Sequence, residues 1–179
     1  GMPVRIPVIE MIEIGAGGGS IASVDNLGRV AVGPQSAGSD PGPVGFGKGG
    51  SEPTVTDADI ALGYIDPDRF AEGRLQIDRA ASEAALVDGI GTHLDLKTAE
   101  SATGVTEIVD EAMASAARMH AVESGKDVSE RLMIAFGGNG PLHATRLARR
   151  AGISRILIPQ DPGVGSAVGF LFAPVSFEI

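Results

Sequence analysis

The pattern of apolar and polar positions predicts a strand-rich start to the chain. Residues 7–14 (PVIEMIEI) and 20–25 (SIASVD) are rich in β-branched residues, which predicts two strands. Residues 15–20 (GAGGGS) lie between them and predict a link from strand to strand. Residues 26–29 (NLGR) predict a hairpin turn before a third strand at 30–32.

Helical periodicity replaces this pattern in the middle of the chain. We predict a short helix with Thr56 as its N-cap and acids in its first turn, then a second helix capped by Asp78 that reaches about Leu94. A third, longer helix begins at Thr98 as its cap and ends at Gly125. Its predicted apolar stripe consists of Val105, Ile108, Val109, Ala112, Met113, Ala116 and Met119.

Short strands and helices alternate in the last third. Residues 132–136 predict a buried strand, and Pro141 fits the first turn of a helix that Gly152 closes. A second strand at 155–159 and a helix opening within 162–169 follow. This order of elements predicts a parallel α/β layer.

Residues 33–50 contain seven glycines and three prolines in eighteen positions. Composition alone is compatible with a flexible linker. A functional loop is the better interpretation, because the stretch lies between two ordered segments and contains Asp40, Phe46 and Lys48.

Composition excludes several classes of function. The formal net charge of −9 without a basic cluster disfavours nucleic-acid binding. The absence of cysteine excludes disulfides and thiolate chemistry and fits a cytoplasmic protein. No apolar run reaches the roughly 20 residues that span a bilayer, so we expect no membrane segment.

The glycine runs do not match standard phosphate motifs. Residues 42–49 have P-loop spacing, but Gly49 stands where a Ser or Thr should bind magnesium. Residues 45–50 fit the dinucleotide fingerprint in letters only, without a preceding strand and a following helix. Neither a P-loop nor a Rossmann site is predicted.

Residues 135–143 (AFGGNGPLH) have a better context, between a strand and a helix. Exposed N–H groups at a helix N-terminus favour a polar or anionic ligand, and glycines let a ligand approach the backbone. A tight turn without a ligand is an equally good interpretation. His143, one turn into the helix, is a candidate ligand contact or a structural residue, whereas His93 and His120 are expected on helix surfaces.

Two acids are candidates for chemistry. Asp40, inside the glycine loop, fits a magnesium–phosphate site or a base, although an Asx-turn is the commoner role of Asp before Pro. Asp57 equally fits the first turn of a helix. No metal-ligand spacing is present, so no metal residue is assigned.

Five motifs follow one another along the chain: residues 13–22 (EIGAGGGSIA), 33–38 (GPQSAG) with 41–43 (PGP), 53–58 (PTVTDA), 135–144 (AFGGNGPLHA) and 163–169 (GVGSAVG). Together they resemble the hydantoinase A / 5-oxoprolinase family, which includes the nucleotide-binding subunits of acetone and acetophenone carboxylases. The resemblance implies an α/β fold with a mixed sheet and packed helices, part of an ATPase fold of the actin/Hsp70/sugar-kinase type with ribonuclease-H-like subdomains. It departs at residues 43–47 (PVGFG), where the family usually has Pro-Ala-Cys-Tyr-Gly.

The resemblance also implies a function. Family members use ATP and a divalent metal such as Mg²⁺ to phosphorylate a substrate carbonyl oxygen, which activates a cyclic amide (hydantoin or 5-oxoproline) for hydrolysis. Carried over by motif, the nucleotide-binding residues are Gly137, Gly138, Asn139 and Gly140. The residues on the phosphate or substrate side are Gly17, Gly18, Gly19 and Ser20, and the catalytic acids are Asp40 and Asp57.

The upstream Asp-Gly-Gly-Thr phosphate loops of the family are absent, so we expect a fragment that is inactive in isolation and requires a hydantoinase B-type subunit or domain. The predicted segments are a β-rich glycine-loop part (3–56), a helical part (57–130) and an α/β nucleotide-side part (131–179). Two alternative functions are open: a noncatalytic nucleotide-binding or regulatory module, and a subunit of an ATP-dependent ketone carboxylase.

Overall fold

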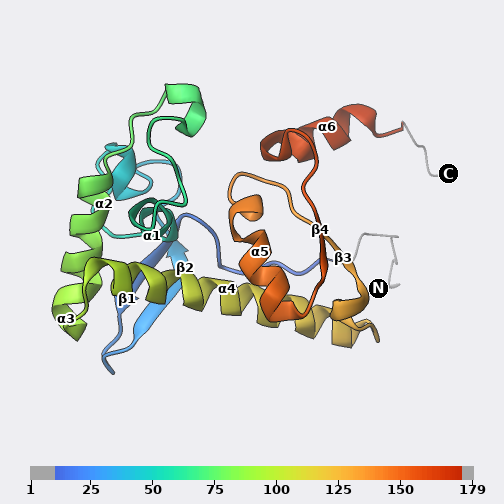
Figure 1. The fold of residues 1–179 in the computed structure, drawn as a ribbon, viewed down its shortest axis with the longest axis horizontal. Helices are drawn as coiled ribbons and strands as arrows, with labels where there is room; N and C mark the ends of the chain where they lie inside the picture. The colour runs from blue at the N-terminus through green and yellow to red at the C-terminus, as the bar shows by residue number, and fades with distance from the viewer. Residues whose placement is uncertain (1–10, 175–179) are drawn as a thin grey trace, which may run out of the picture.

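The computed structural model describes residues 11–174, which form two groups of elements joined by one long helix. At one end lie β1 (Ser20–Val24), β2 (Val30–Ser36), α1 (Val55–Ala61), α2 (Arg79–Leu86) and α3 (Thr92–Leu94). The long helix α4 (Thr98–Glu123) extends from this group to the second (Figure 1). There lie β3 (Leu132–Ile134), α5 (Gly140–Ala151), β4 (Arg155–Leu157) and α6 (Gly165–Phe172).

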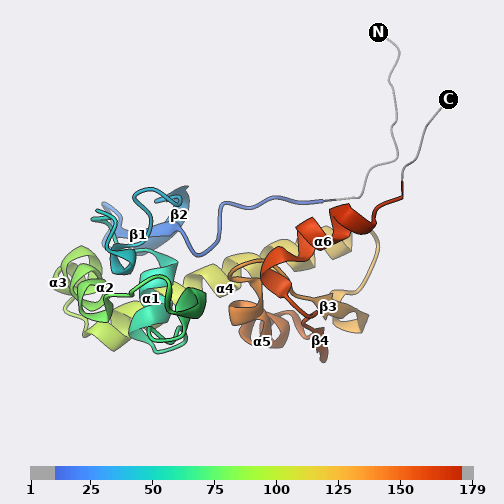
Figure 2. The same cartoon turned by 90° about the horizontal axis from the view of Figure 1, so that it is seen from above.

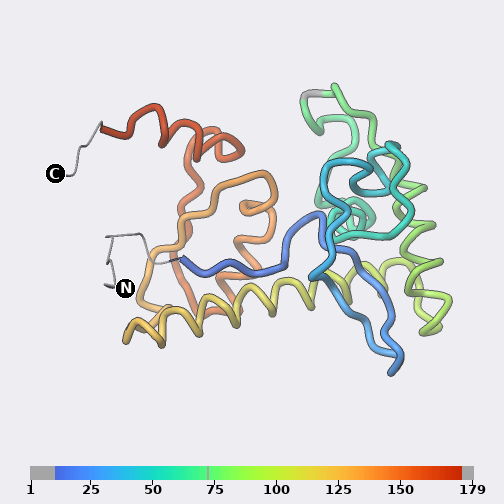
Figure 3. The backbone as a smooth tube through the Cα atoms, turned by 180° about the vertical axis from the view of Figure 1, so that it is seen from behind, coloured from blue at the N-terminus to red at the C-terminus, as the bar shows by residue number. Residues whose placement is uncertain are grey.

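Strands β1 and β2 form the predicted antiparallel hairpin. Asp25 stabilises its turn, because its carboxylate accepts the backbone N–H groups of Leu27 and Arg29. Residues 11–14 form no strand, and residues 7–10 of that predicted strand lie outside the described residues. The segment before β1 instead runs without secondary structure from the β3/β4 end of the molecule to the hairpin (Figure 3).

The glycine-rich stretch 33–50 is an ordered loop. β2 continues through its start to Ser36, and a 3-10 turn, η1 (Val44–Phe46), lies within it. A Cβ on Gly45 would collide with the side chain of Ser82 and lie 2.9 Å from Ile60. The loop therefore packs tightly on α1 and α2 at this point, and only glycine fits.

Helix α1 begins two residues earlier than predicted. Its N-cap is Thr54, not Thr56: Thr54 Oγ1 accepts the N–H of Asp57, and Asp57 accepts the N–H of Thr54 at 2.9 Å. The sequence offers two capping boxes, Thr54 with Asp57 and Thr56 with Asp59, because each has an acid three positions on. Tertiary contacts of Asp59, described below, leave the first box as the cap.

The middle helices follow the predicted limits closely. Asp78 caps α2, and the helix continues through a π-helical turn, η3 (Val87–Gly91), into α3, which ends at Leu94. A further 3-10 turn, η2 (Phe70–Gly73), precedes α2. Thr98 is the first residue of α4 and not its cap; Lys97 occupies the cap position, and its N–H donates to Glu100 at 2.7 Å. Gly125 follows the end of α4 with a positive φ of 66°.

The last third forms the predicted strand–helix–strand–helix unit. The strand predicted as buried at 132–136 is wrong in extent and burial: β3 ends at Ile134, and Leu132 and Ile134 are exposed among the described residues. β3 and β4 pair in parallel, with α5 as the connection and Gly152 as its left-handed C-cap. Short 3-10 turns, η4 (Val128–Glu130) and η5 (Pro162–Val164), precede β3 and α6. Seen from above, α5 and α6 lie at the same end of α4 (Figure 2).

Two apolar cores correspond to these two groups. The larger core joins β1, α1, α2, η3 and α4 through fully buried residues such as Val55, Leu86, Ile90 and Val105. The smaller one centres on Ala148, Ala151 and Ile153 beneath β3. Because α4 contributes to the large core and also packs along α5, it fixes one group relative to the other.

The chain is an α/β protein with packed helices, as predicted, and its strands form two separate two-stranded sheets. The predicted segment limit at 56/57 falls inside α1, and the three-part division remains a prediction. Within residues 11–174, no helix is long and apolar enough to cross a membrane.

Candidate functional site

Two glycine motifs that lie far apart in the sequence meet in the structure. The backbone carbonyl of Gly18 accepts the N–H of Thr56 at 2.8 Å. A Cβ on Gly18 would overlap Nδ2 of Asn139 and lie 2.7 Å from Oγ1 of Thr56. The first glycine segment, the start of α1 and the turn before α5 therefore share one point of contact.

Hydrogen bonds give the first glycine segment a defined shape. Gly17 N–H donates to Oγ of Ser20 at 3.0 Å, and Ser20 N–H donates back to the carbonyl of Gly17 at 3.0 Å. The carbonyl of Gly19 accepts the N–H of Ala37 at 2.9 Å. Gly18 is the predicted phosphate-side residue that packs against Asn139. Gly19 and Ser20 attach the segment to the end of β2.

The turn before α5 leaves open space around its glycines. Nothing lies within 4 Å of a Cβ built on Gly137, Gly138 or Gly140. Gly137 has a φ of 94°, and its N–H donates to the carbonyl of Pro162 at 2.7 Å. Since helix N-termini carry unpaired N–H groups and a partial positive charge, this turn has the chemistry to receive an anion.

A shallow cavity of about 270 Å³ lies beside this turn. It is lined by Tyr64, Ile65, Asp66, Arg69, Phe70, Gly138, Asn139 and Leu142. Nδ2 of Asn139 is inaccessible to solvent and has no hydrogen-bond partner among the described residues. A buried amide donor without an acceptor is costly. This nitrogen is enclosed at the contact with Gly18 and does not open into the cavity.

Below the turn, one helical turn into α5, lies an ion cluster of three buried side chains and the partly buried Arg146. Nδ1 of His143 lies 2.7 Å from Oδ1 of Asp110, and Nε2 lies 3.2 Å from Oδ2 of Asp59. Arg146 binds the second oxygen of Asp110 at 2.5 Å and lies 3.8 Å from Asp59. Both acids are 0 % exposed and His143 is 1 % exposed.

The cluster favours its charged form. Burial lowers the pKa of His143, but the hydrogen bond to Asp110 and the charge of Asp59 outweigh it and raise the pKa to about 9. Burial raises the pKa of Asp110, and the hydrogen bonds from His143 and Arg146 more than compensate, so that its pKa is lowered. At neutral pH His143 is therefore a cation, and together with Arg146 it faces Asp110 and Asp59.

The cluster extends to the cavity through Arg146. Its guanidinium carbon lies 4.5 Å from the centre of the Tyr64 ring, a cation–π contact. Tyr64 and Asn139 both line the cavity. His143 thus lies beneath the site and not in it, and its contacts are with protein groups.

The comparisons with known proteins fit this geometry. The hydantoinase/oxoprolinase family model matches residues 1–179. The chain belongs to the hydantoinase/oxoprolinase family.

Relatives in this family are considerably longer than the chain. The acetophenone carboxylase gamma subunit of Aromatoleum aromaticum is 46 % identical over 80 % of the chain and 20 % of the relative. The caprolactamase alpha subunit of Pseudomonas jessenii is 37 % identical over 98 % of the chain and 25 % of the relative. The chain therefore spans a fifth to a quarter of these proteins.

Solved structures confirm the fold. An ATP-dependent caprolactamase from Pseudomonas jessenii superimposes with a TM-score of 0.84 at 39 % identity, over 93 % of the chain and 24 % of that protein. A nucleotide-free acetone carboxylase superimposes with a TM-score of 0.82 at 29 % identity, over 87 % of the chain and 22 % of that protein. The chain has the fold of a part of these ATP-dependent enzymes.

Asp57, a predicted catalytic acid, has a structural role in this family member. It is 0 % exposed, and its carboxylate accepts five hydrogen bonds. The donors are the N–H groups of Val44, Gly45 and Thr54 and the hydroxyls of Thr54 and Ser82. Because every lone pair is engaged, Asp57 holds the glycine loop on α1 and α2 and does not face a cavity.

Asp40, the other predicted acid, is exposed and lies away from the α5 turn. It lines a separate hollow of about 270 Å³ with Ile21, Ser36, Ala37, Pro41, Gly42, Gly50, Ser51 and Glu52. The structure does not bring Asp40 into the cavity that Asn139 lines. A catalytic role for Asp40 remains a proposal that depends on parts of the enzyme beyond this chain.

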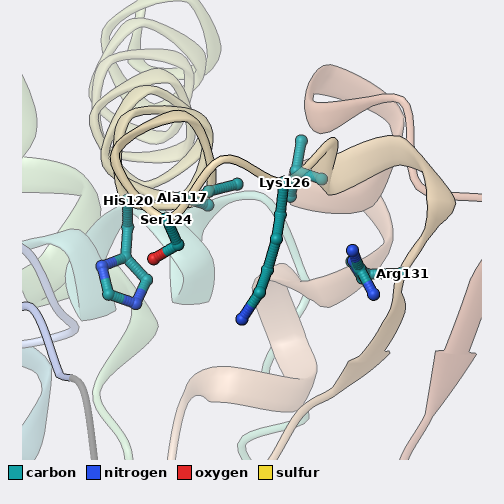
Figure 4. A pocket seen from close by; sticks show the side chains of 7 residues that line it. Ala117, His120, Ser124, Lys126 and Arg131 are labelled. Carbon is teal, nitrogen blue, oxygen red and sulfur yellow. The ribbon is translucent and has the colours of Figure 1, made fainter.

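A further hollow, of about 590 Å³, lies at the C-terminal end of α4. His120, Lys126 and Arg131 line it with Ala117, Ala121, Ser124 and Val128, and Figure 4 shows His120 and Lys126 pointing in the same direction. Its walls come from α4 and the turn that follows, so it is distinct from the glycine turns. His120 thus has the surface position that the sequence predicts.

Sequence reasoning missed Asp59, Asp110 and Arg146. One signal was present: Asp110 follows Val109 directly within the apolar stripe of α4, and an acid on a buried helix face requires a charged partner. His143 and Arg146, three positions apart on α5, share a face and supply such partners. Among the described residues, no group of three or more His, Asp or Glu side chains has an arrangement that could hold a metal ion.

Proposed function

We propose that the chain is the nucleotide-side part of an ATP-dependent enzyme that activates the carbonyl oxygen of a cyclic amide by phosphorylation and so prepares the amide for hydrolysis. The names of relatives support this proposal, since they include a caprolactamase and the 5-oxoprolinase of Saccharomyces cerevisiae. Partner subunits fit as well, because caprolactamase and the carboxylases are named as subunits.

The meeting of Gly18 with Asn139 is the observation that carries the proposal. It joins the first glycine segment to the glycine turn at the N-terminus of α5. The motif predicted to bind the nucleotide and the motif predicted to bind the phosphate or substrate are therefore adjacent, although 121 positions separate Gly18 from Asn139.

The residues present fit a nucleotide at the α5 turn. The open space around Gly137, Gly138 and Gly140 admits a planar or tetrahedral group against the backbone. Bound ATP supplies a phosphoryl group, which turns a poorly reactive amide oxygen into a good leaving group.

Among the described residues, no group of three or more His, Asp or Glu side chains could hold a metal ion. We therefore assign no residue of this chain to Mg²⁺. Asp40, which is exposed within the glycine-rich loop, is the acid that we propose to contribute to the reacting centre of the full-length enzyme.

Calorimetry with ATP on the full-length protein tests the proposal, together with ATP hydrolysis in the presence of 5-oxoproline, hydantoin or caprolactam. We expect ATP binding, and hydrolysis that rises with one of these amides. Gly138→Val should weaken ATP binding at least tenfold, because the added side chain meets no protein atom and enters the ligand's space. Gly104→Ala in α4 is the matched control, since it too meets no atom within 4 Å.

The ketone carboxylase alternative rests on the 46 % identity to the acetophenone carboxylase gamma subunit. The same assay separates the two functions when acetone or acetophenone is supplied with bicarbonate. Hydrolysis of ATP that requires a ketone and bicarbonate, and ignores amides, would replace the amide proposal. ATP binding without turnover on any substrate would favour the noncatalytic module.

A further inference from the structure

We infer that Asp59, Asp110, His143 and Arg146 form a positioning cluster that holds Asn139 and Tyr64 in place and thereby sets the ATP affinity of the full-length enzyme without contacting ATP. This inference rests on the proposed function of the α5 turn. It assigns a role to three buried side chains and the partly buried Arg146, which the proposed chemistry does not use.

Helix geometry links the cluster to the site. Thr56 and Asp59 lie three positions apart on α1, and Asn139 and His143 lie four positions apart at the start of α5. Residues at these spacings share a helix face. Gly18 therefore contacts Thr56 and Asn139 one helical turn away from the place where Asp59 contacts His143.

Asp110 ties this pair of helices to α4. Its two oxygens bind His143 at 2.7 Å and Arg146 at 2.5 Å, so one carboxylate fixes two successive turns of α5. α4 is also the helix that packs in the large core with α1. The angle of α5, and with it the place of its N-terminal turn, thus depends on Asp110.

Arg146 fixes the opposite wall of the cavity. Its guanidinium lies against the ring of Tyr64, which is 45 % exposed and lines the cavity that Asn139 also lines. An exposed ring without such a contact has several rotamers available. The cluster therefore reaches both walls, through His143 below Asn139 and through Arg146 beneath Tyr64.

Charge makes the cluster sensitive to the loss of one member. Neither oxygen of Asp59 has a hydrogen-bond donor among the described residues. The cations His143 and Arg146 therefore compensate the negative charge of its carboxylate. His143 faces Asp59 on α1, Asp110 on α4 and, 3.1 Å from its Nδ1, Arg146 on its own helix. Because a buried unpaired charge is unstable, loss of the His143 proton forces the helices to adjust.

The test measures ATP affinity of the full-length protein by calorimetry from pH 8 to 10, beside its melting temperature. We expect wild-type affinity to fall at least fivefold as pH rises through about 9, the pKa of His143. His143→Gln should bind ATP at least tenfold more weakly at pH 8 and lack this fall. Asp59→Asn, which keeps the shape of the side chain, should weaken binding similarly.

Arg150→Gln is the matched control, because Arg150 lies one turn further along α5 and pairs with Glu107 and Glu111 at the surface. It should keep both wild-type affinity and the pH profile. Wild-type protein that binds no ATP overturns the proposed function. Wild-type protein that binds ATP with a flat profile while remaining folded overturns this inference alone, and it does so even if a variant fails to fold.

Discussion

Nδ1 of His143 and Oδ1 of Asp110 lie 2.7 Å apart in the interior of the protein and connect α5 to α4 across 33 positions of sequence. Asp59 approaches the other ring nitrogen of the same histidine. A protonated histidine between two buried carboxylates makes stability depend on pH, and the sign of that dependence follows from its pKa.

The first prediction concerns this pH dependence. Folding raises the pKa of His143 from 6.5 to about 9, so its contribution is fully present below pH 6.5 and is lost as pH rises through about 9. The shift corresponds to on the order of 3 kcal/mol of unfolding free energy. Urea unfolding at pH 6 and pH 9 should show the loss in wild type, and His143→Gln should be nearly flat over this range.

The second prediction concerns Asp57. Asp57→Asn places an amide N–H₂ against hydroxyl and N–H donors at Gly45, Thr54 and Ser82. We expect a loss of roughly 2–4 kcal/mol of stability, measured by urea unfolding, because buried donors lose their acceptor. Asp40→Asn, at an exposed position, should change stability by less than about 0.5 kcal/mol. Equal effects of the two variants would show that Asp57 is not the anchor of the loop.

The third prediction concerns the contact between the two glycine segments. Gly18→Ala should lower the melting temperature, because its methyl group overlaps Asn139 and presses on Thr56. Asn139→Ala in the same chain removes the overlapping amide and should restore part of the loss, which a double-mutant cycle measures. The contact with Thr56 remains, so the rescue is incomplete. Strictly additive effects would mean that Gly18 and Asn139 do not touch.

The fourth prediction compares two arginines on α5. Arg146→Ala leaves Asp110 and Asp59 buried with one cation fewer, and we expect a loss of about 3–5 kcal/mol. Arg150→Ala removes pairs with the half-exposed Glu107 and Glu111 and should cost less than about 1 kcal/mol. Thermal or urea unfolding of both variants measures these losses of stability. A smaller loss for Arg146→Ala than for Arg150→Ala would contradict the role of the cluster.

Local signals in the sequence determined most of the secondary structure. Asp78, Gly125 and Gly152 end or begin helices where capping chemistry predicts, and the 26–29 turn joins the hairpin. Each of these signals acts within a few residues, so the sequence alone suffices to read it. The five motifs, in their order along the chain, were likewise enough to identify the family, and the match over residues 1–179 confirms it.

Tertiary structure decided what those signals leave open. Thr54 and Thr56 both begin a capping box, and the choice between them depends on Asp59, whose partner His143 is 84 positions away. The strand predicted through residues 11–14 has no pairing partner within residues 11–174 and does not form there, since a strand needs a neighbour for its hydrogen bonds. Asp57 and His143 were singled out by their motifs, but burial gave both of them protein partners.

The sequence by itself therefore determined the helices, the hairpin, the parallel unit and the family, because capping, turn formation and periodicity are local. Only the tertiary structure brought Gly18 to Asn139 and enclosed Asp59, Asp110, His143 and Arg146 between three helices. Burial and charge pairing between distant residues depend on how the helices pack, and no spacing along the chain specifies that packing.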